Sequence, residues 1–306
     1  MTIVNNATSA FYERSTQGIG ALRKRAEAIQ AQLGRGERLS RSSDDPVAAS
    51  RIRLLQRSDR ISQVDMANAN RASADLTLAD AALSSFASLA IRARELAVQA
   101  ASDVLTPEQR ASIGVELEQI HGQLVSLGNS RNSAGHALFG GETAGDAFAL
   151  DGAGNASYIG TASSSEIPIG DGESVIGGLT GPEFLDYDSG GTPTNLMALV
   201  KQLATDLQGA AADPAQAARD ALGGLSAGID SITTAQTVVG TRLSWIDLTL
   251  ERHVTLSEAR ASEQADLGGT DIAASIADLQ QVMLVLEASQ ASFAKLADLS
   301  LFALVR

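Results

Sequence analysis

The strongest constraint on the fold of this chain is an apolar pattern near its C-terminus that repeats at alternating steps of four and three. From Ile272 these steps select mostly large apolar side chains: Ile272, Ile276, Leu279, Met283, Leu286, Gln290, Phe293, Ala297, Ser300 and Leu304. An α-helix places positions with this spacing on one narrow stripe, as in the seam of a coiled coil. Because so narrow a stripe cannot be buried by its own helix, it needs a partner along its full length. We therefore predict an assembly seam that includes Ile272, Ile276, Leu279, Met283, Leu286, Phe293 and Leu304.

Four other segments carry the same spacing. Shorter seams cover residues 19–33, 69–90 and 113–127, and a longer one covers residues 218–253. Seams occur at both chain ends, so we expect the N- and C-terminal helices to pack on each other. Aromatic residues make up only 4% of the chain, which favours long helices with thin seams over a bulky enzyme core.

Three short motifs predict helix starts. Residues 106–109 (TPEQ) and 213–216 (DPAQ) each place a capping side chain before a proline and a glutamine three residues after the cap. Asp44, Asp45 and Pro46 fit the same pattern, with Asp45 as the cap, Pro46 as the first helical residue and both carboxylates near the positive end of the helix. Residues 268–271 (GGTD) break the chain and start the last helix.

The middle of the chain has a different character. Residues 140–195 contain thirteen glycines, and the runs 156–162 and 165–177 alternate in the manner of short strands. We predict a mainly α fold with long antiparallel coiled-coil-like arms from both termini and a small β-rich central insertion. The expected parts are an N-terminal arm at 1–139, an outer insertion at 140–195 and a C-terminal arm at 196–306.

Charge and cysteine content exclude several classes of function. The formal net charge is −13, and residues 132–200 contain no Lys or Arg, so nucleic acid is a poor candidate partner. The chain has no cysteine, which excludes disulfides, thiol catalysis and thiolate metal sites. The first residues lack the continuous apolar core of a secretory signal peptide, and we expect no membrane insertion.

One pattern resembles a catalytic motif. Residues 224–228 (GLSAG) match the nucleophile elbow G-x-S-x-G, and Asp247 and His253 follow in the order of a hydrolase triad. An elbow requires a strand before the serine and a sharp turn at it, whereas residues 215–222 are helical in pattern. The periodicity therefore favours a helix through Ser226 and no catalytic residue.

Two acidic patterns resemble metal sites. Residues 151–156 (DGAGNA) start like a calcium loop, but position 153 is Ala and position 162 is Ala where oxygen ligands are required, so we predict a hairpin turn. Asp44 and Asp45 have no His, Cys or second acidic cluster nearby, so we assign them to helix capping. We predict no metal site and no cofactor.

Several segments resemble the flagellin superfamily. Residues 38–50 (RLSRSSDDPVAAS) resemble its N-terminal signature, in which one helix turns at a Ser/Asp-Asp cluster into a second helix. The continuation 46–49 is more similar to hook–filament junction proteins than to filament flagellins. Residues 129–144, 238–247, 269–281 and 296–302 resemble further segments of that branch. The ending LFALVR differs from the short aromatic ending of junction proteins, and its basic last residue is similar to flagellin tails.

The resemblance implies a non-enzymatic structural subunit of the bacterial flagellum. Such a subunit leaves the cell through the flagellar type III export channel, without a cleaved signal peptide, and works outside the cell in a ring between hook and filament. The implied partners are further copies of the chain, flagellin, another hook-associated protein and an export chaperone. The resemblance also implies that Asp44, Asp45 and Pro46 fix the reversal between the first two helices.

Three alternatives remain open from the sequence. The first is a filament-forming flagellin, which the basic last residue favours. The second is a surface-exposed ligand-binding module that uses the acidic central insertion. The third is an enzyme, which depends on Ser226 alone.

Overall fold

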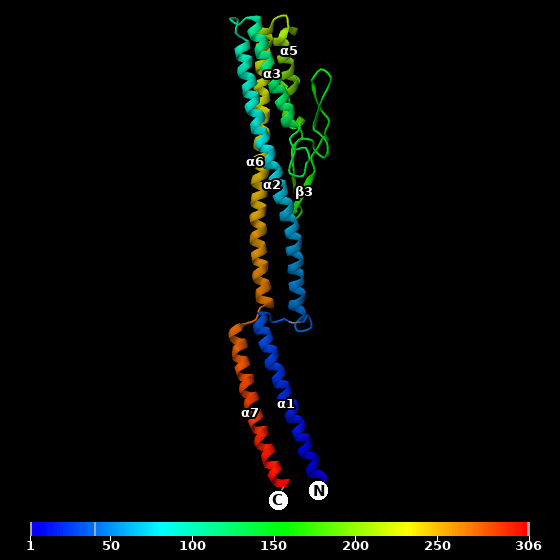
Figure 1. Ribbon diagram of the computed structural model, residues 1–306, viewed down its shortest axis with the longest axis vertical. Helices are drawn as coiled ribbons and strands as arrows, with labels where there is room; N and C mark the ends of the chain where they lie inside the picture. The colour runs from blue at the N-terminus through cyan, green and yellow to red at the C-terminus, as the bar shows by residue number, and fades with distance from the viewer. Residues whose placement is uncertain (1, 40, 305–306) are drawn as a thin grey trace. The chain divides into compact units, whose positions relative to one another are not determined.

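The computed structural model describes residues 2–39 and 41–304, with side chains described for 10–39 and 41–295. Helices dominate this part of the chain, as the periodicity predicts (Figure 1). The helices are α1 (Thr2–Arg35), α2 (Pro46–Ala100), α3 (Pro107–Gly128), α4 (Pro182–Leu185), α5 (Leu196–Thr205), α6 (Pro214–Gly268) and α7 (Ile272–Leu304), with a π-helical turn, η1 (Asp206–Ala210), after α5.

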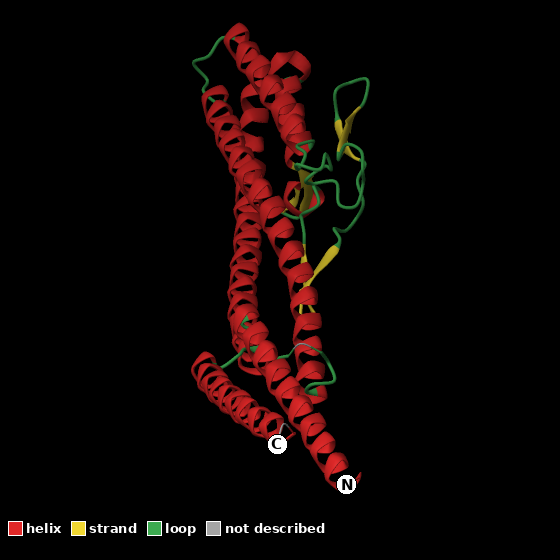
Figure 2. Ribbon diagram, turned by 60° about the horizontal axis from the view of Figure 1, so that its bottom comes forward, coloured by secondary structure: helices red, strands yellow, loops and turns green. Residues whose placement is uncertain are grey.

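The strands all lie in the middle of the chain and form three separate antiparallel hairpins (Figure 2). The pairs are β1 (Phe148–Leu150) with β2 (Ala156–Tyr158), β3 (Glu166–Gly170) with β4 (Glu173–Ile176), and β5 (Asp186–Ser189) with β6 (Thr192–Asn195). The mainly α fold with a small β-rich middle is therefore confirmed. The three-part division at residues 139 and 195 stays a prediction.

The chain forms two compact units. One comprises Met1–Arg60 and Leu256–Arg306, and the other comprises Ile61–Thr255. We call them the terminal unit and the central unit. The terminal unit contains α1, α7, the start of α2 and the end of α6. The central unit contains the rest of α2 and α6 together with α3, α5 and all six strands.

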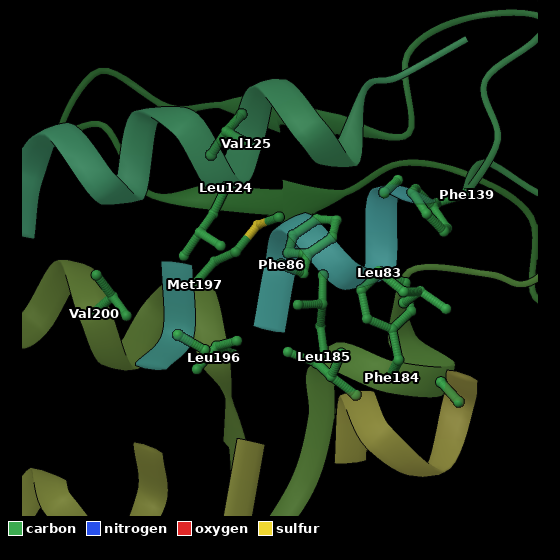
Figure 3. Close-up of a cluster of buried hydrophobic side chains, with 14 of the residues drawn as sticks. Leu83, Phe86, Leu124, Val125, Phe139, Phe184, Leu185, Leu196, Met197 and Val200 are labelled. Carbon is green, nitrogen blue, oxygen red and sulfur yellow. The ribbon is translucent and has the colours of Figure 1, made fainter. Parts of the chain in front are cut away.

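The seams predicted for residues 69–90, 113–127 and 218–253 form the core of the central unit. Their large apolar members are buried or half-buried along α2, α3 and α6, and α5 adds further apolar side chains to the same cluster. Phe86, Phe139 and Phe184 are fully buried, and their ring centroids lie 4.9–5.9 Å apart. Around these rings, Leu83, Leu124, Leu185 and Met197 fill the space between helices and hairpins (Figure 3).

The predicted helix starts are confirmed by their caps. At α3, Thr106 accepts a hydrogen bond from Gln109 N–H, and the Gln109 side chain accepts one from Thr106 N–H, which completes a capping box. At α6, Asp213 accepts from Gln216 N–H at 3.0 Å, and at α7 Asp271 accepts from Ala274 N–H at 3.0 Å. The glutamine of the DPAQ motif does not close a box, because its side chain bonds to Asp220 instead.

The hairpin β3–β4 is fastened to α2 and α6 through polar contacts. His253 is buried on α6, with its Nε2 2.7 Å from the Ile169 carbonyl oxygen and its Nδ1 2.9 Å from Ser62 Oγ. Because a carbonyl oxygen only accepts, Nε2 carries a proton, and in the neutral imidazole Nδ1 then accepts from the Ser62 hydroxyl. Arg252 adds a hydrogen-bonded ion pair with Glu173.

By length and composition alone, α2 and α7 each contain a stretch apolar enough to cross a membrane. Two such helices are weak evidence, because the packed helices of a soluble protein pass the same test. The absence of membrane insertion stays a prediction.

Candidate assembly site

The two connections of the terminal unit pair with each other. The Arg38 amide donates to the Gly268 carbonyl oxygen at 2.8 Å, and the Thr270 amide donates to the Gly36 carbonyl oxygen at 3.0 Å. Glu37 and Gly269 form an antiparallel bridge between these bonds. This short ladder ties the end of α1 to the start of α7, although the two segments are more than 200 residues apart in sequence.

Asp45 occupies the N-cap position of α2. Its Oδ1 accepts from the Ala48 amide at 3.0 Å, and its Oδ2 accepts from Arg38 Nη2 at 3.2 Å. The hydrogen bond from Ala48, with the Arg38 side chain second, lowers the pKa of the Asp45 carboxyl. Asp44 Oδ2 accepts from the Arg41 amide at 2.8 Å, which closes the turn before the helix. Both carboxylates therefore hold backbone in place.

Two further ion pairs connect the start of α2 to the end of α6. Arg51 binds both carboxylate oxygens of Glu263, at 2.6 and 3.0 Å. The Asp59 carboxylate accepts hydrogen bonds from Arg260 Nη1 at 3.2 Å and from the side-chain amide of Gln264 at 2.8 Å. The hydrogen bond from Arg51 lowers the pKa of Glu263. The bidentate geometry holds the two helix ends in one orientation.

Helices α1 and α7 pack through a thin apolar seam. Ala26, Ile29 and Val282 are buried there, and the partly buried Leu22, Leu33 and Leu279 surround them. The Tyr12 and Phe293 rings meet edge to face with centroids 5.4 Å apart. Arg25 flanks the seam with a two-oxygen contact to Asp278 at 3.1 and 3.2 Å.

The structure divides the residues predicted as one seam on α7 into two sets. Leu279, Leu286 and Phe293 lie toward α1 with Val282, which the sequence spacing missed in favour of Met283. Ile272, Ile276 and Met283 are 61%, 44% and 47% exposed. Leu304 falls where side chains are not described. The apolar stripe of α7 thus has an exposed margin beyond the part that α1 covers.

The hydrolase and metal patterns do not form sites. Ser226 and His253 lie on the same continuous helix, which separates them by about 40 Å at about 1.5 Å per residue. Asp151 accepts hydrogen bonds from the amides of Ala153 and Asn155 within the β1–β2 turn, as expected for a hairpin. Among the described residues, no group of three His, Cys, Asp or Glu side chains is placed to hold a metal ion.

The N-terminal helices of the chain match a known family of proteins. Residues 5–144 match the bacterial flagellin N-terminal helical region. This N-terminal part of the chain is therefore similar to the helical N-terminal domain of bacterial flagellins. The turn at Asp44, Asp45 and Pro46 lies inside the matched segment.

Two curated relatives match this chain over nearly its whole length. The flagellar hook-associated protein 3 of Escherichia coli is 26% identical over 318 residues, covering 97% of this chain and 98% of the relative. The flagellar hook-associated protein 3 of Salmonella typhimurium is 27% identical over 321 residues, covering 98% and 99%.

Solved structures share the fold. The flagellar hook-associated protein-3 of Legionella pneumophila gives a TM-score of 0.63 at 15% identity and covers 71% of this chain and 98% of its own. FlgL of Bacillus cereus gives a TM-score of 0.54 at 23% identity and covers 70% and 99%.

Proposed function

We propose that this chain is a structural subunit of the bacterial flagellum that forms a junction ring between hook and filament. The observation that carries the proposal is the match of nearly the whole chain to two relatives that are both named hook-associated protein 3. A structural role fits a molecule whose polar residues are used to fasten helices and hairpins. The proposal includes no catalytic residue and no cofactor.

In this ring the terminal helices would make the lateral contacts of the inner tube. Support comes from the exposed margin of the apolar stripe of α7, where Ile272, Ile276 and Met283 are exposed. The turn at Asp44 and Asp45 would keep α1 and α2 in the orientation that presents the terminal helices for assembly. The hairpins of the central unit would face outward.

The proposed partners follow from the position of the ring. They are further copies of the chain, flagellin on one side, another hook-associated protein on the other, and an export chaperone before assembly. The subunit would be exported through the flagellar type III channel and would function outside the cell. The alternative of a filament-forming flagellin is not favoured, because both curated relatives are named for the hook-associated protein.

Deletion of the gene in the source organism tests the proposal. We expect bare hooks in electron micrographs and monomeric flagellin shed into the medium, because the filament loses its adaptor. Filaments that remain attached would contradict the proposal. Loss of flagellin itself, with no flagellin in cells or medium, would support the filament-subunit alternative.

A further inference from the structure

Within the central unit, one outer face of α2 is both apolar and basic. Ile61 and Val64 are 53% and 60% exposed, and Arg71 is exposed two turns further along the same face. At 3.6 residues per turn, Val64 lies about half a turn away from the buried Ser62 side of the helix. Arg71 forms no ion pair with any residue that the structure describes. This face is a row of apolar side chains with a free positive charge.

An outer face of α6 is apolar and acidic. Leu248 is 59% exposed, and the exposed Asp247 and Glu251 lie within about 100° of it around the helix. His253 points the other way, into the contact with α2. Like Arg71, these carboxylates are without an ion pair within the described part of the chain. The face is therefore apolar like that of α2 and carries the opposite charge.

The two faces lie at the same height on opposite edges of the α2–α6 pair. The hydrogen bond between Ser62 and His253 joins the two helices at this height, and Figure 1 shows α2 and α6 running side by side. Ile61 and Val64 flank Ser62, while Leu248 and Glu251 lie within about 1.5 turns of His253. Since both faces turn away from the shared contact, one chain cannot bring them together.

We propose that the outer face of α2 in one copy docks on the outer face of α6 in the next copy. The proposal deepens the junction-ring function and rests on it. Opposite free charges beside exposed apolar side chains specify the pairing, since like charges oppose the α2–α2 and α6–α6 pairings. A contact between two different surfaces at one height is heterologous, and rotation about an axis along the helices closes it into a ring.

Cysteine cross-linking in assembled flagella tests the contact, because the chain has no cysteine of its own. We expect a full-length variant with Val64→Cys and Leu248→Cys to give, after oxidation, a ladder of dimers and larger multimers on a non-reducing gel. Val64→Cys alone should stay monomeric. A matched pair, Val64→Cys with the highly exposed Val104→Cys at the α2–α3 connection, should also stay monomeric.

Three outcomes would overturn the contact. The first is dimers from Val64→Cys alone, which indicate an α2–α2 contact. The second is cross-links to flagellin in place of a second copy. The third is a double variant that gives only monomers in cells whose filaments remain attached. The last result would leave the junction function standing. By contrast, attached filaments in the deletion strain would remove the junction function whatever the cross-links show.

Charge reversal keeps the contact testable if the cysteine pair fails to assemble. We expect Arg71→Glu to reduce incorporation into isolated flagella at least fivefold, because the docked faces would then both be acidic. Adding Asp247→Arg and Glu251→Arg to the same chain should restore it, because each contact again joins opposite charges. Unchanged incorporation in the first variant, or no recovery in the threefold variant while its purified chain folds normally, would overturn the proposal.

Discussion

Replacing Ser62 by alanine should weaken the fastening of hairpin β3–β4. The Ser62 hydroxyl is the donor to His253 Nδ1, and both side chains are buried. The substitution removes that donor and leaves a buried imidazole nitrogen without a partner, which costs about 1–3 kcal/mol. For a unit of this size, a loss of about 2 kcal/mol corresponds to a fall in Tm of about 4–8 °C.

The assay is thermal unfolding followed by fluorescence of Trp245, the only tryptophan of the chain, which lies in the central unit. Hydrogen exchange at the β3–β4 amides should rise in the same variant. The matched control is Ser85→Ala, because Ser85 is an exposed serine on the same helix that donates only to the Ala81 carbonyl oxygen. Equal Tm values for the two variants would refute the assigned hydrogen-bond pattern.

Three other perturbations test the packing and electrostatics. Phe184→Ala should cost about 3–5 kcal/mol because the ring is fully buried, whereas Phe11→Ala, at an exposed ring, should cost far less in denaturant unfolding; equal costs would contradict the core assignment. Burial lowers the pKa of His121 from its ordinary 6.5, so the neutral form is favoured in the folded state. The contribution of neutral His121 to the free energy of unfolding should therefore be fully present above pH 6.5 and fall as the pH drops below it. If the free energy of unfolding of His121→Leu decreases just as steeply with falling pH, this assignment is contradicted. The hydrogen bond from Arg51 lowers the pKa of Glu263. The contribution of this ion pair to stability should therefore be present above pH 4.5 and lost as the pH falls through the lowered pKa. Protease sensitivity at the start of α2 and the end of α6 that does not change with acid or salt would contradict this.

Periodicity predicted most of the helical core, because a helix that is buried on one side carries apolar residues at regular spacing in its sequence. The positions from Ala69 to Ala90 are buried in the order that the spacing gives. From Ala218 to His253 only alternate positions are buried, and Leu222, Ile229, Leu243 and Leu250 are partly buried. The helix caps were equally local, since each depends on side chains within four residues. Asp45 could be assigned to capping because a short polar side chain directly before a proline is the local signature of a helix start.

The phase of α7 was harder to predict. The spacing predicted a seam through Met283, but the helix is apolar on several sides. Only the packing of α1 selects Val282 in its place. The fastening of His253 to Ser62 joins residues 191 apart in sequence. No local pattern indicates such a pair, and His253 therefore looked like one more seam position.

The π-helical turn after α5 also escaped the sequence analysis. It ends the short α5 before α6 begins, and Gly209 there adopts a φ of 114°, which favours glycine. A single glycine in a helical pattern does not distinguish such a turn from an ordinary helix interior. The neighbouring DPAQ motif marked only the start of α6.

Immunogold electron microscopy of intact flagella tests the central claim most directly. Antibody against the full-length chain should label one narrow band where the hook meets the filament, and the deletion strain should show no label. Label along the whole filament would contradict the junction role in favour of a flagellin, and label on the cell surface away from flagella would contradict both.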